Sequence, residues 1–386
     1  MSEQAIGVAQ PRMLVLARES RAMTQGQLAE AMQALADSDG KVSQGYVSRA
    51  EAGRLTVSGE RLGLYARALN YPAQLLCLTE HEVGAGPGLV HHRKKQAISA
   101  ADLRRIHALL NLTRIQLRAL LSGVARPAGI GIPHIPVDAY NTPEEAAGRL
   151  RAERGIPKGP IDSVVRVVEG AGALVACREL VPSVPLDSGG ASVPVDAVSG
   201  CPPDEDPVVL LNAGTPGDRQ RFTLAHELGH MVMHSVPDPE QEAQANRFAA
   251  ELLMPAKQIR DQLYGQIDVP LLLELKGEWK VSMWALLRRA HTLGLTSDWQ
   301  YRSLAVEMSS LGYRTSEPGG LEPEMPIAVT SLVNRLLQQG RDVDELASAT
   351  YLHTDEFVRL YLSRPISPGV GLSSRSVAST NGEAAI

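Results

Sequence analysis

The segment from Arg221 to His230, RFTLAHELGH, has the spacing in this chain that most directly dictates a chemistry. On a helix, His226 and His230 lie one turn apart on the same face, so both imidazoles can reach one metal ion. This HExxH spacing is typical of zinc-binding helices. Zinc that activates a water molecule needs three protein ligands and one open position. The motif supplies two of these ligands and places Glu227 beside them.

The third ligand has to come from another part of the chain. His234 lies eight residues beyond His226, roughly 12 Å along a helix, which is too far for the two to share a metal. Extended zinc motifs with a third histidine have Gly and His where this chain has Met233 and Val236. A carboxylate on the following helix is therefore the remaining source.

A suitable helix is predicted at residues 240–253, EQEAQANRFAAELL. Its Ala, Phe and Leu residues form an apolar stripe that can pack against the motif helix. We predict Glu242 as the third ligand, with Glu240 and Glu251 as alternatives. Asn246, one turn after Glu242, is predicted to support a ligand histidine from outside the metal's own ligand set.

Glu227 has a defined task in such a site. Zinc lowers the pKa of its bound water, and an adjacent carboxylate can take the proton as that water attacks a polarised carbonyl. The predicted reaction is metal-assisted hydrolysis of a peptide bond. The alternatives are two ordinary core histidines, or a zinc ion that supports the fold without turnover.

The strings RFTLAHELGHMVMH and EAQANRFAAELLMP together resemble the ImmA/IrrE family of zinc metallopeptidases, which are similar to gluzincins. The resemblance covers about residues 160–315. It implies Zn²⁺ as the cofactor, with His226, His230 and Glu242 as its ligands and Glu227 as the catalytic residue.

Residues 11 to about 80 are predicted to form five short amphipathic helices, with Thr24 and Ser43 as N-caps of the second and third. The strings ARESRAMTQGQLAEAM and VSQGYVSRAEAG resemble the helix-turn-helix domain of the xenobiotic-response-element (XRE) class. Residues 33–41 lengthen the usual turn. In such domains the recognition helix enters the major groove of double-stranded DNA. The resemblance implies DNA contacts from Gln25, Gln44, Tyr46, Ser48 and Arg49.

A helical module that binds proteins is the alternative to this DNA-binding interpretation. The formal net charge of −5 means that any DNA binding has to be local.

A long helix is predicted from Ser99 to about Gly123. Apolar residues recur along it at spacings of three and four, which forms a heptad seam. The helix either packs on its own chain or joins two chains, so residues 99–124 are a candidate homodimer interface. The seam consists of Leu103, Ile106, Leu110, Thr113, Leu117, Leu120 and Val124.

With 386 residues, the chain is long enough for two or three domains. The predicted fold class is multidomain: an all-α head, a helical spacer, and an α+β gluzincin-like zinc peptidase domain with C-terminal helices. The predicted segments are a helix-turn-helix domain (1–83), a hinge, long helix and linker (84–136), the peptidase domain (137–315), a small helical module (316–362) and a disordered tail (363–386).

Within the peptidase region, strands are predicted at 174–177 and 207–212, the second leading into the motif helix. We expect this second strand at a sheet edge, where an extended peptide substrate can add to it. The Gly-, Pro- and Ser-rich segment 182–206 is predicted to be a mobile flap. A helix is predicted at 279–290, followed by His291, which is either a donor to the tetrahedral intermediate or an ordinary surface or core histidine.

Composition narrows the cellular setting. No apolar run is long enough to span a bilayer and the N-terminus lacks a signal-peptide core, so we expect a cytoplasmic protein without a membrane partner. The three cysteines are scattered, which argues against a disulfide scaffold or a Cys-type zinc site.

The predicted function is a DNA-binding transcriptional regulator that carries a zinc-dependent endopeptidase. The resemblance implies limited cleavage of a protein partner such as a repressor, in stress, prophage or toxin–antitoxin control. The alternative is a non-proteolytic transcription factor or antitoxin whose zinc domain is structural or sensory. Glu227 favours the enzyme, because a purely structural site does not need it.

Overall fold

The computed structural model describes most of the chain. The described residues are 7–36, 41–83, 89–92, 98–122, 124, 131–138, 140–180, 195–202, 205–236 and 239–362. The tail predicted at 363–386 lies outside them, as do residues 37–40 of the lengthened turn and parts of the predicted hinge, linker and flap.

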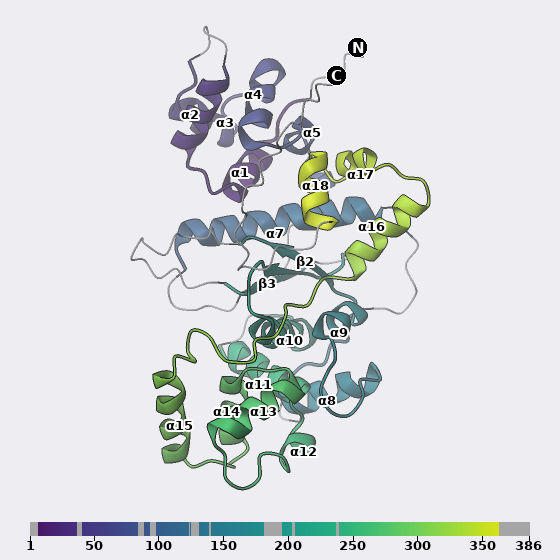
Figure 1. The fold of residues 1–386 in the computed structure, drawn as a ribbon. Coiled ribbons are helices and arrows are strands. Elements are labelled where there is room, and N and C mark those ends of the chain that lie inside the picture. Colours follow the sequence, from purple (N-terminus) through teal and green to yellow (C-terminus); the bar gives the residue numbers. More distant parts are fainter. Residues whose placement is uncertain are drawn as a thin grey trace, which may run out of the picture.

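Short helices form the N-terminal head (Figure 1). Both predicted N-caps are present: Thr24 forms a capping box with Gln27, and the Ser43 hydroxyl accepts a hydrogen bond from the Tyr46 amide. Gly53, with φ of 70°, follows the third helix. The helices are α1 (Pro11–Ser20), α2 (Gln25–Leu35), α3 (Gln44–Glu51), α4 (Gly59–Leu69), α5 (Ala73–Leu76) and α6 (Glu80–Val83).

A mixed four-stranded sheet lies in the middle of the molecule. Its order is β1-β3-β4-β2; β3 is antiparallel to both β1 and β4, while β2 is parallel to β4. The strands are β1 (Leu89–His92), β2 (Leu174–Arg178), β3 (Ala197–Cys201) and β4 (Val208–Asn212). β1 therefore forms within the predicted hinge.

Two predictions about this sheet are wrong. The strand before the motif helix, β4, is internal, because β3 and β2 occupy both its sides, so a substrate cannot add to it. The flap prediction is wrong for residues 197–201, which form the internal strand β3. Small residues such as Ser199 and Gly200 let this strand fit between layers of helices, and they hide the hydrophobic periodicity of a strand.

The sheet separates two apolar cores. In β4, Val208 and Leu210 join the core on the side of the head, whereas Val209 and Leu211 join the other core. This alternation follows from the two-residue period of a strand.

The long helix α7 (Ala100–Leu121) packs on both sides within the chain. One side contacts α1, and the other lies across β3 and β4 (Figure 1). The seam residues Ile106, Leu110 and Leu117 are at most 1% exposed. The seam is therefore covered by the chain itself, and the candidate homodimer interface along it is not supported.

The motif helix, α10 (Gly217–Met233), lies on the other side of the sheet from α7 (Figure 1). It packs against α8 (Pro143–Glu153), α9 (Val164–Gly170) and α11 (Gln241–Leu253). Beyond them follow α12 (Ala256–Ile259), α13 (Val269–Trp279), α14 (Met283–Thr292) and α15 (Asp298–Ser310).

The single helix predicted at 279–290 is in fact the junction of two helices. Lys280 adopts a left-handed conformation with φ of 54° and ends α13, and the Ser282 hydroxyl caps α14. Trp279 and Met283 are nevertheless both buried in the core.

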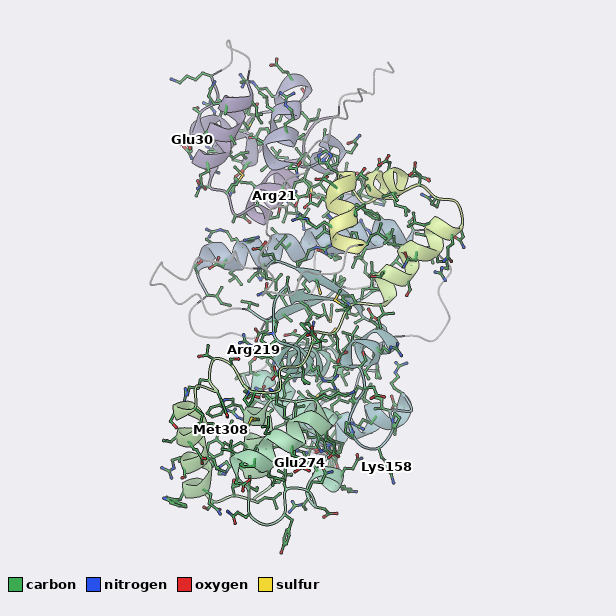
Figure 2. The ribbon with its side chains drawn as sticks, viewed as in Figure 1. Arg21, Glu30, Lys158, Arg219, Glu274 and Met308 are labelled. Atoms are coloured by element: carbon green, nitrogen blue, oxygen red, sulfur yellow. The ribbon has the colours of Figure 1, made fainter. Side chains whose placement is uncertain are left out.

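The last helices return to the head. α16 (Ala328–Gln338) contacts β2, and α17 (Val343–Ala349) contacts α7, with α18 (Thr354–Tyr361) beside them (Figure 1). Figure 2 places Arg21 near this junction, and its guanidinium donates two hydrogen bonds of 2.8 Å to the Glu356 carboxylate. Head, α7 and C-terminal helices thus share one core. Among the described residues, no helix is long and apolar enough to cross a membrane.

Candidate metal centre and active site

Arg221 anchors the start of the motif helix. Its buried guanidinium donates to the carbonyl oxygens of Lys280 (2.8 Å) and Asp162 (3.1 Å) and pairs with Glu324. These contacts connect α10 to three segments that are distant in sequence.

Gly229 lets α11 approach α10 closely. A Cβ atom at this position would lie 2.9 Å from Cδ1 of Phe248, which is fully buried. The glycine inside the motif therefore meets a packing requirement, and the close approach carries Glu242 to the histidines.

Three polar side chains converge where α10 and α11 meet. The Nε2 atoms of His226 and His230 are 3.0 Å apart, and the Glu242 carboxylate oxygens lie 3.5 and 3.3 Å from them. Both histidines are fully buried, whereas the Glu242 side chain is 41% exposed. The structure thus brings the three predicted ligands together, with a solvent-facing side at Glu242.

The chemistry of these donors fits zinc. Two imidazoles and one carboxylate are a ligand combination of catalytic zinc sites. Burial lowers the pKa of His230 to about 4, so its imidazole is neutral near pH 7, the form that binds metals. Burial alone would raise the pKa of Glu242, but hydrogen bonds from His226 and His230 hold it well below its usual range.

The alternative ligands lie elsewhere. Glu251 pairs with Arg289 and accepts a hydrogen bond from the Ala256 amide. Glu240 precedes α11 and is not part of the cluster of three.

A residue of the central sheet orients Glu227. Its fully buried carboxylate accepts a 2.5 Å hydrogen bond at Oε2 from the Ser199 hydroxyl of β3. Burial, together with the charge of Glu227, raises the pKa of the nearby Cys201 thiol to about 12. Sequence reasoning missed Ser199 because its strand was predicted to be a flap.

His234 supports His230. The two Nδ1 atoms are 3.0 Å apart, and His234 Nε2 lies 2.8 Å from Gln244 Oε1. A proton on His230 Nδ1 and another on His234 Nε2 satisfy both contacts and leave a lone pair on His230 Nε2 for a metal. Asn246 was predicted for this supporting role, but its amide donates instead to the Glu242 carbonyl oxygen (2.7 Å).

In the head, a polar network fixes the start of α3. Arg18 forms hydrogen bonds of 2.5 and 2.9 Å with the Glu51 carboxylate, which also accepts one of 2.8 Å from Gln25. The side-chain oxygen of Gln25 in turn accepts a 2.8 Å hydrogen bond from the side-chain amide of Gln44. Gln44 is therefore held at the first position of α3.

The other residues predicted to touch DNA also lie on α3. Arg49 and Gln44 are exposed, while Tyr46 and Ser48 are half-buried. The Tyr46 ring lies 5.3 Å from the Arg61 guanidinium.

Two protein-family models match parts of this chain. Residues 14–76 match the helix-turn-helix family model HTH_3, and residues 192–291 match Peptidase_M78, the IrrE N-terminal-like domain. The chain thus contains one region similar to helix-turn-helix domains and one similar to the IrrE N-terminal-like domain. Both resemblances and the predicted fold class are confirmed. No curated protein matches the chain.

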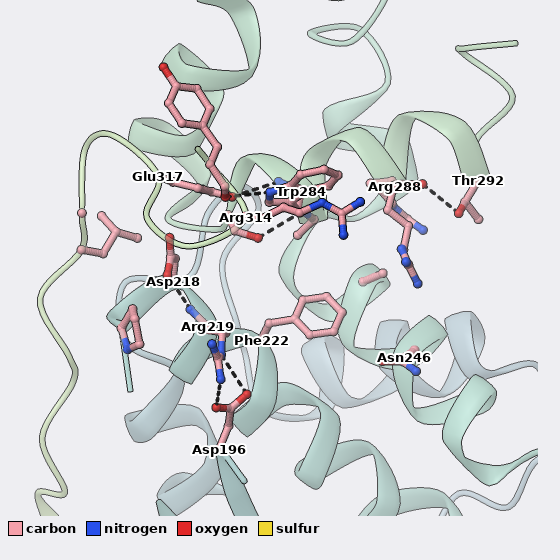
Figure 3. A pocket seen from close by; sticks show the side chains of 18 of the residues that line it. Asp196, Asp218, Arg219, Phe222, Asn246, Trp284, Arg288, Thr292, Arg314 and Glu317 are labelled. Atoms are coloured by element: carbon pink, nitrogen blue, oxygen red, sulfur yellow. Dashed lines mark hydrogen bonds and ion pairs between the residues drawn. The ribbon is translucent and has the colours of Figure 1, made fainter. Parts of the chain in front are cut away.

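A cavity of about 670 Å³ lies along α10 and α11. Phe222 lies one turn before His226 and Asn246 one turn after Glu242, so the cavity begins about 6 Å along each helix from the ligand cluster. Figure 3 shows Phe222 and Arg288 directed toward each other across the cavity.

The charges on the cavity wall are only partly compensated. Arg219 pairs with Asp196, and Arg247 pairs with Glu144. Arg288 has no ion pair with any described carboxylate, and neither has Arg314, which lies 5.5 Å from the centre of the Trp284 ring. The cavity therefore combines aromatic surface with two guanidinium groups that lack a counter-ion in the described structure.

His291 does not line this cavity. Its ring lies 4.6 Å from that of Tyr301, and its Nε2 is 3.5 Å from Asp298 Oδ1. The geometry favours a packed, half-exposed histidine over a donor to the reacting carbonyl.

Proposed function

We propose that this protein is a DNA-binding transcriptional regulator whose IrrE-like domain is a zinc-dependent endopeptidase. The observation that carries the proposal is the convergence of His226, His230 and Glu242 beside the buried carboxylate of Glu227. The three converging residues hold the ion, and bound zinc supplies Lewis-acid chemistry that polarises a carbonyl and acidifies water.

Glu227 accepts and delivers the proton in this proposal. The hydrogen bond from Ser199 fixes Oε2, so Oε1 is the oxygen that takes the proton of the attacking water. The same oxygen then gives the proton to the amine nitrogen as the C–N bond breaks. Burial of the carboxylate keeps it from being solvated by bulk water.

The adjacent cavity receives a substrate side chain that flanks the cleaved bond. Phe222 and Trp284 provide apolar contact, and Arg288 and Arg314 attract a carboxylate. An acidic residue near the cleavage site of a protein partner, such as a repressor, is the substrate feature that these groups select.

The head places the enzyme on DNA. Exposed Gln44 and Arg49 on α3 are suited to base edges or phosphates in the major groove. Regulation then combines promoter binding with limited cleavage of a partner protein.

The test compares the wild type with Glu227→Gln. We expect one zinc ion per chain in both purified proteins, measured by mass spectrometry of metals, because Glu227 is not a ligand. Sequencing of new protein N-termini in cells should show cleavage products only with the wild type. Arg288→Glu should shift the flanking residues from acidic to basic. Zinc in both proteins without any wild-type-specific N-termini would contradict the endopeptidase and favour a sensory or structural zinc domain.

A further inference from the structure

A second cavity, of about 620 Å³, lies where the head, α7, β2 and the C-terminal helices meet. Its walls include Arg21, the C-cap residue that follows α1, Arg105 and Gln116 of α7, Arg178 of β2 and Tyr361 of α18. The proposed peptidase reaction uses none of these residues. The cavity has the size of a pocket for a small organic molecule.

Arg178 is a buried cation with neutral partners. It is 6% exposed and donates hydrogen bonds to the Tyr361 hydroxyl (2.7 Å) and the Cys177 carbonyl oxygen (2.8 Å). Gln116 Oε1 lies 3.4 Å from the same guanidinium. No described carboxylate forms an ion pair with it. A buried charge without a counter-ion is unfavourable, so an anion in this cavity would stabilise it.

Arg105 is a second cation on the cavity wall with incomplete contacts. Its Nε is buried and has no hydrogen-bond partner in the described structure, and a terminal nitrogen donates to the Glu179 carbonyl oxygen (3.1 Å). Burial lowers the pKa of Arg105, as expected for a charge that is desolvated and poorly compensated.

The lining as a whole is positive and partly apolar. Four arginines and two glutamates line it, so the formal charge is +2. One of the glutamates, Glu356, already pairs with Arg21 and Arg359. Apolar side chains such as Leu109, Leu112 and Val329 cover other parts of the wall. An anion with an apolar body matches both kinds of surface.

We propose that this cavity binds a small organic anion, a carboxylate or a phosphate ester, whose charged group lies between Arg105 and Arg178. Planar guanidinium groups bind such oxygens in bidentate geometry. Arg21 on the cavity wall is one turn from Arg18, whose network holds Gln44. The anion is thus positioned to affect the DNA-reading helix, as an effector would.

The test is isothermal titration calorimetry of the full chain with sodium benzoate and with phenyl phosphate as probes. Benzamide, which has the same ring without a charge, is the control ligand. We expect saturable binding of at least one anion and none of benzamide; the stronger anion distinguishes a carboxylate site from a phosphate site. Arg105→Gln should weaken binding about tenfold or more.

The matched control variant is Arg104→Gln. Arg104 neighbours Arg105 on α7, but its side chain is 59% exposed and does not line the cavity. The Arg104→Gln variant should bind both anions with the affinity of the wild type. Arg178→Lys, which keeps the charge but loses the planar fork, should also weaken binding. If Arg178→Lys does not fold, the comparison of Arg105→Gln, at a half-buried position, with Arg104→Gln still tests the proposal.

Three results would overturn the proposal. They are no heat of binding for either anion up to millimolar concentration, equal binding of benzamide and benzoate, or equal losses in Arg104→Gln and Arg105→Gln.

Discussion

At the scale of single residues, the candidate metal centre depends on a chain of contacts behind its ligands. His230 is held by His234, and His234 by Gln244, so the ring orientation of a buried ligand is set from the end of α10 and the start of α11. The Ser199 hydroxyl plays the corresponding part for Glu227. Metal affinity and catalysis should therefore respond to residues that touch neither metal nor substrate.

His234→Ala should lower the affinity for zinc about 10- to 100-fold, because His230 loses the group that fixes its tautomer and orientation. Competition with a chromogenic chelator measures this affinity. His291→Ala is the matched control, since His291 is a histidine outside the cluster. Unchanged zinc affinity in His234→Ala would show that His230 does not need its support.

The ligands themselves could be predicted from the sequence, whereas their supports could not. Spacing within one helix places His226 and His230 together, and a carboxylate helix nearby supplies Glu242. Ser199 reaches Glu227 only through a strand pairing, and no local pattern marks it. His234 was recognised on the same helix face as His226 and His230. Its sequence spacing shows that it cannot share a metal with His226, but does not show that it bonds to His230.

At the scale of elements, the candidate metal centre depends on how closely α10 and α11 pack. Gly229→Ala should destabilise the protein by about 1–3 kcal/mol, because the added methyl group would overlap the ring of buried Phe248. It should also weaken zinc binding, because relief of the overlap moves α11 and Glu242 away. Denaturant unfolding and the chelator competition measure the two effects.

Gly277→Ala in α13 is the control for this change. A Cβ atom at Gly277 meets no atom within 4 Å, so the substitution should stabilise the helix by about 0.5–1 kcal/mol. Equal stabilities of the two alanine variants would contradict the packing role of Gly229.

The head offers a second comparison at this scale. Glu51→Gln should destabilise it by about 3 kcal/mol, because largely buried Arg18 loses its short ion pair and keeps only the 3.9 Å contact with Glu19. Exposed Arg49→Ala should leave stability unchanged and weaken DNA binding. Circular dichroism follows unfolding, and fluorescence anisotropy follows binding to a duplex selected from a random library with the wild-type protein. Loss of stability in both variants would contradict this division of roles.

Helices with caps were predictable, but the sheet was only partly so. Thr24 and Ser43 begin helices through contacts with residues three positions away, which sequence displays directly. Whether β4 is internal depends on β2 and β3, and the pattern within β4 carries no record of its neighbours. The same holds for the apolar seam of α7. Its periodicity fits packing against a partner chain as well as packing within the same chain.

At the scale of the whole molecule, the sheet divides the protein into two cores, and the candidate metal centre belongs to one of them. The head and α16–α18 share the other core through contacts such as Arg21 with Glu356, which are 335 positions apart. No sequence pattern predicts such a contact. Removal of a bound metal is therefore expected to affect the core that contains the ligand cluster and not the core of the head.

Removal of the metal with EDTA should therefore loosen the IrrE-like domain and spare the head. A ligand present at 1,000 times its dissociation constant stabilises the folded state by about 4 kcal/mol, and that stabilisation is lost on chelation. We expect faster amide hydrogen exchange in α10 and α11, which meet at the cluster, and unchanged exchange in α2 and α3, which pack in the other core. His226→Ala, without a complete site, should not respond to EDTA. Equal acceleration in α3 and α10 would instead mean that the sheet transmits the state of the candidate metal centre to α3, the helix proposed to read DNA.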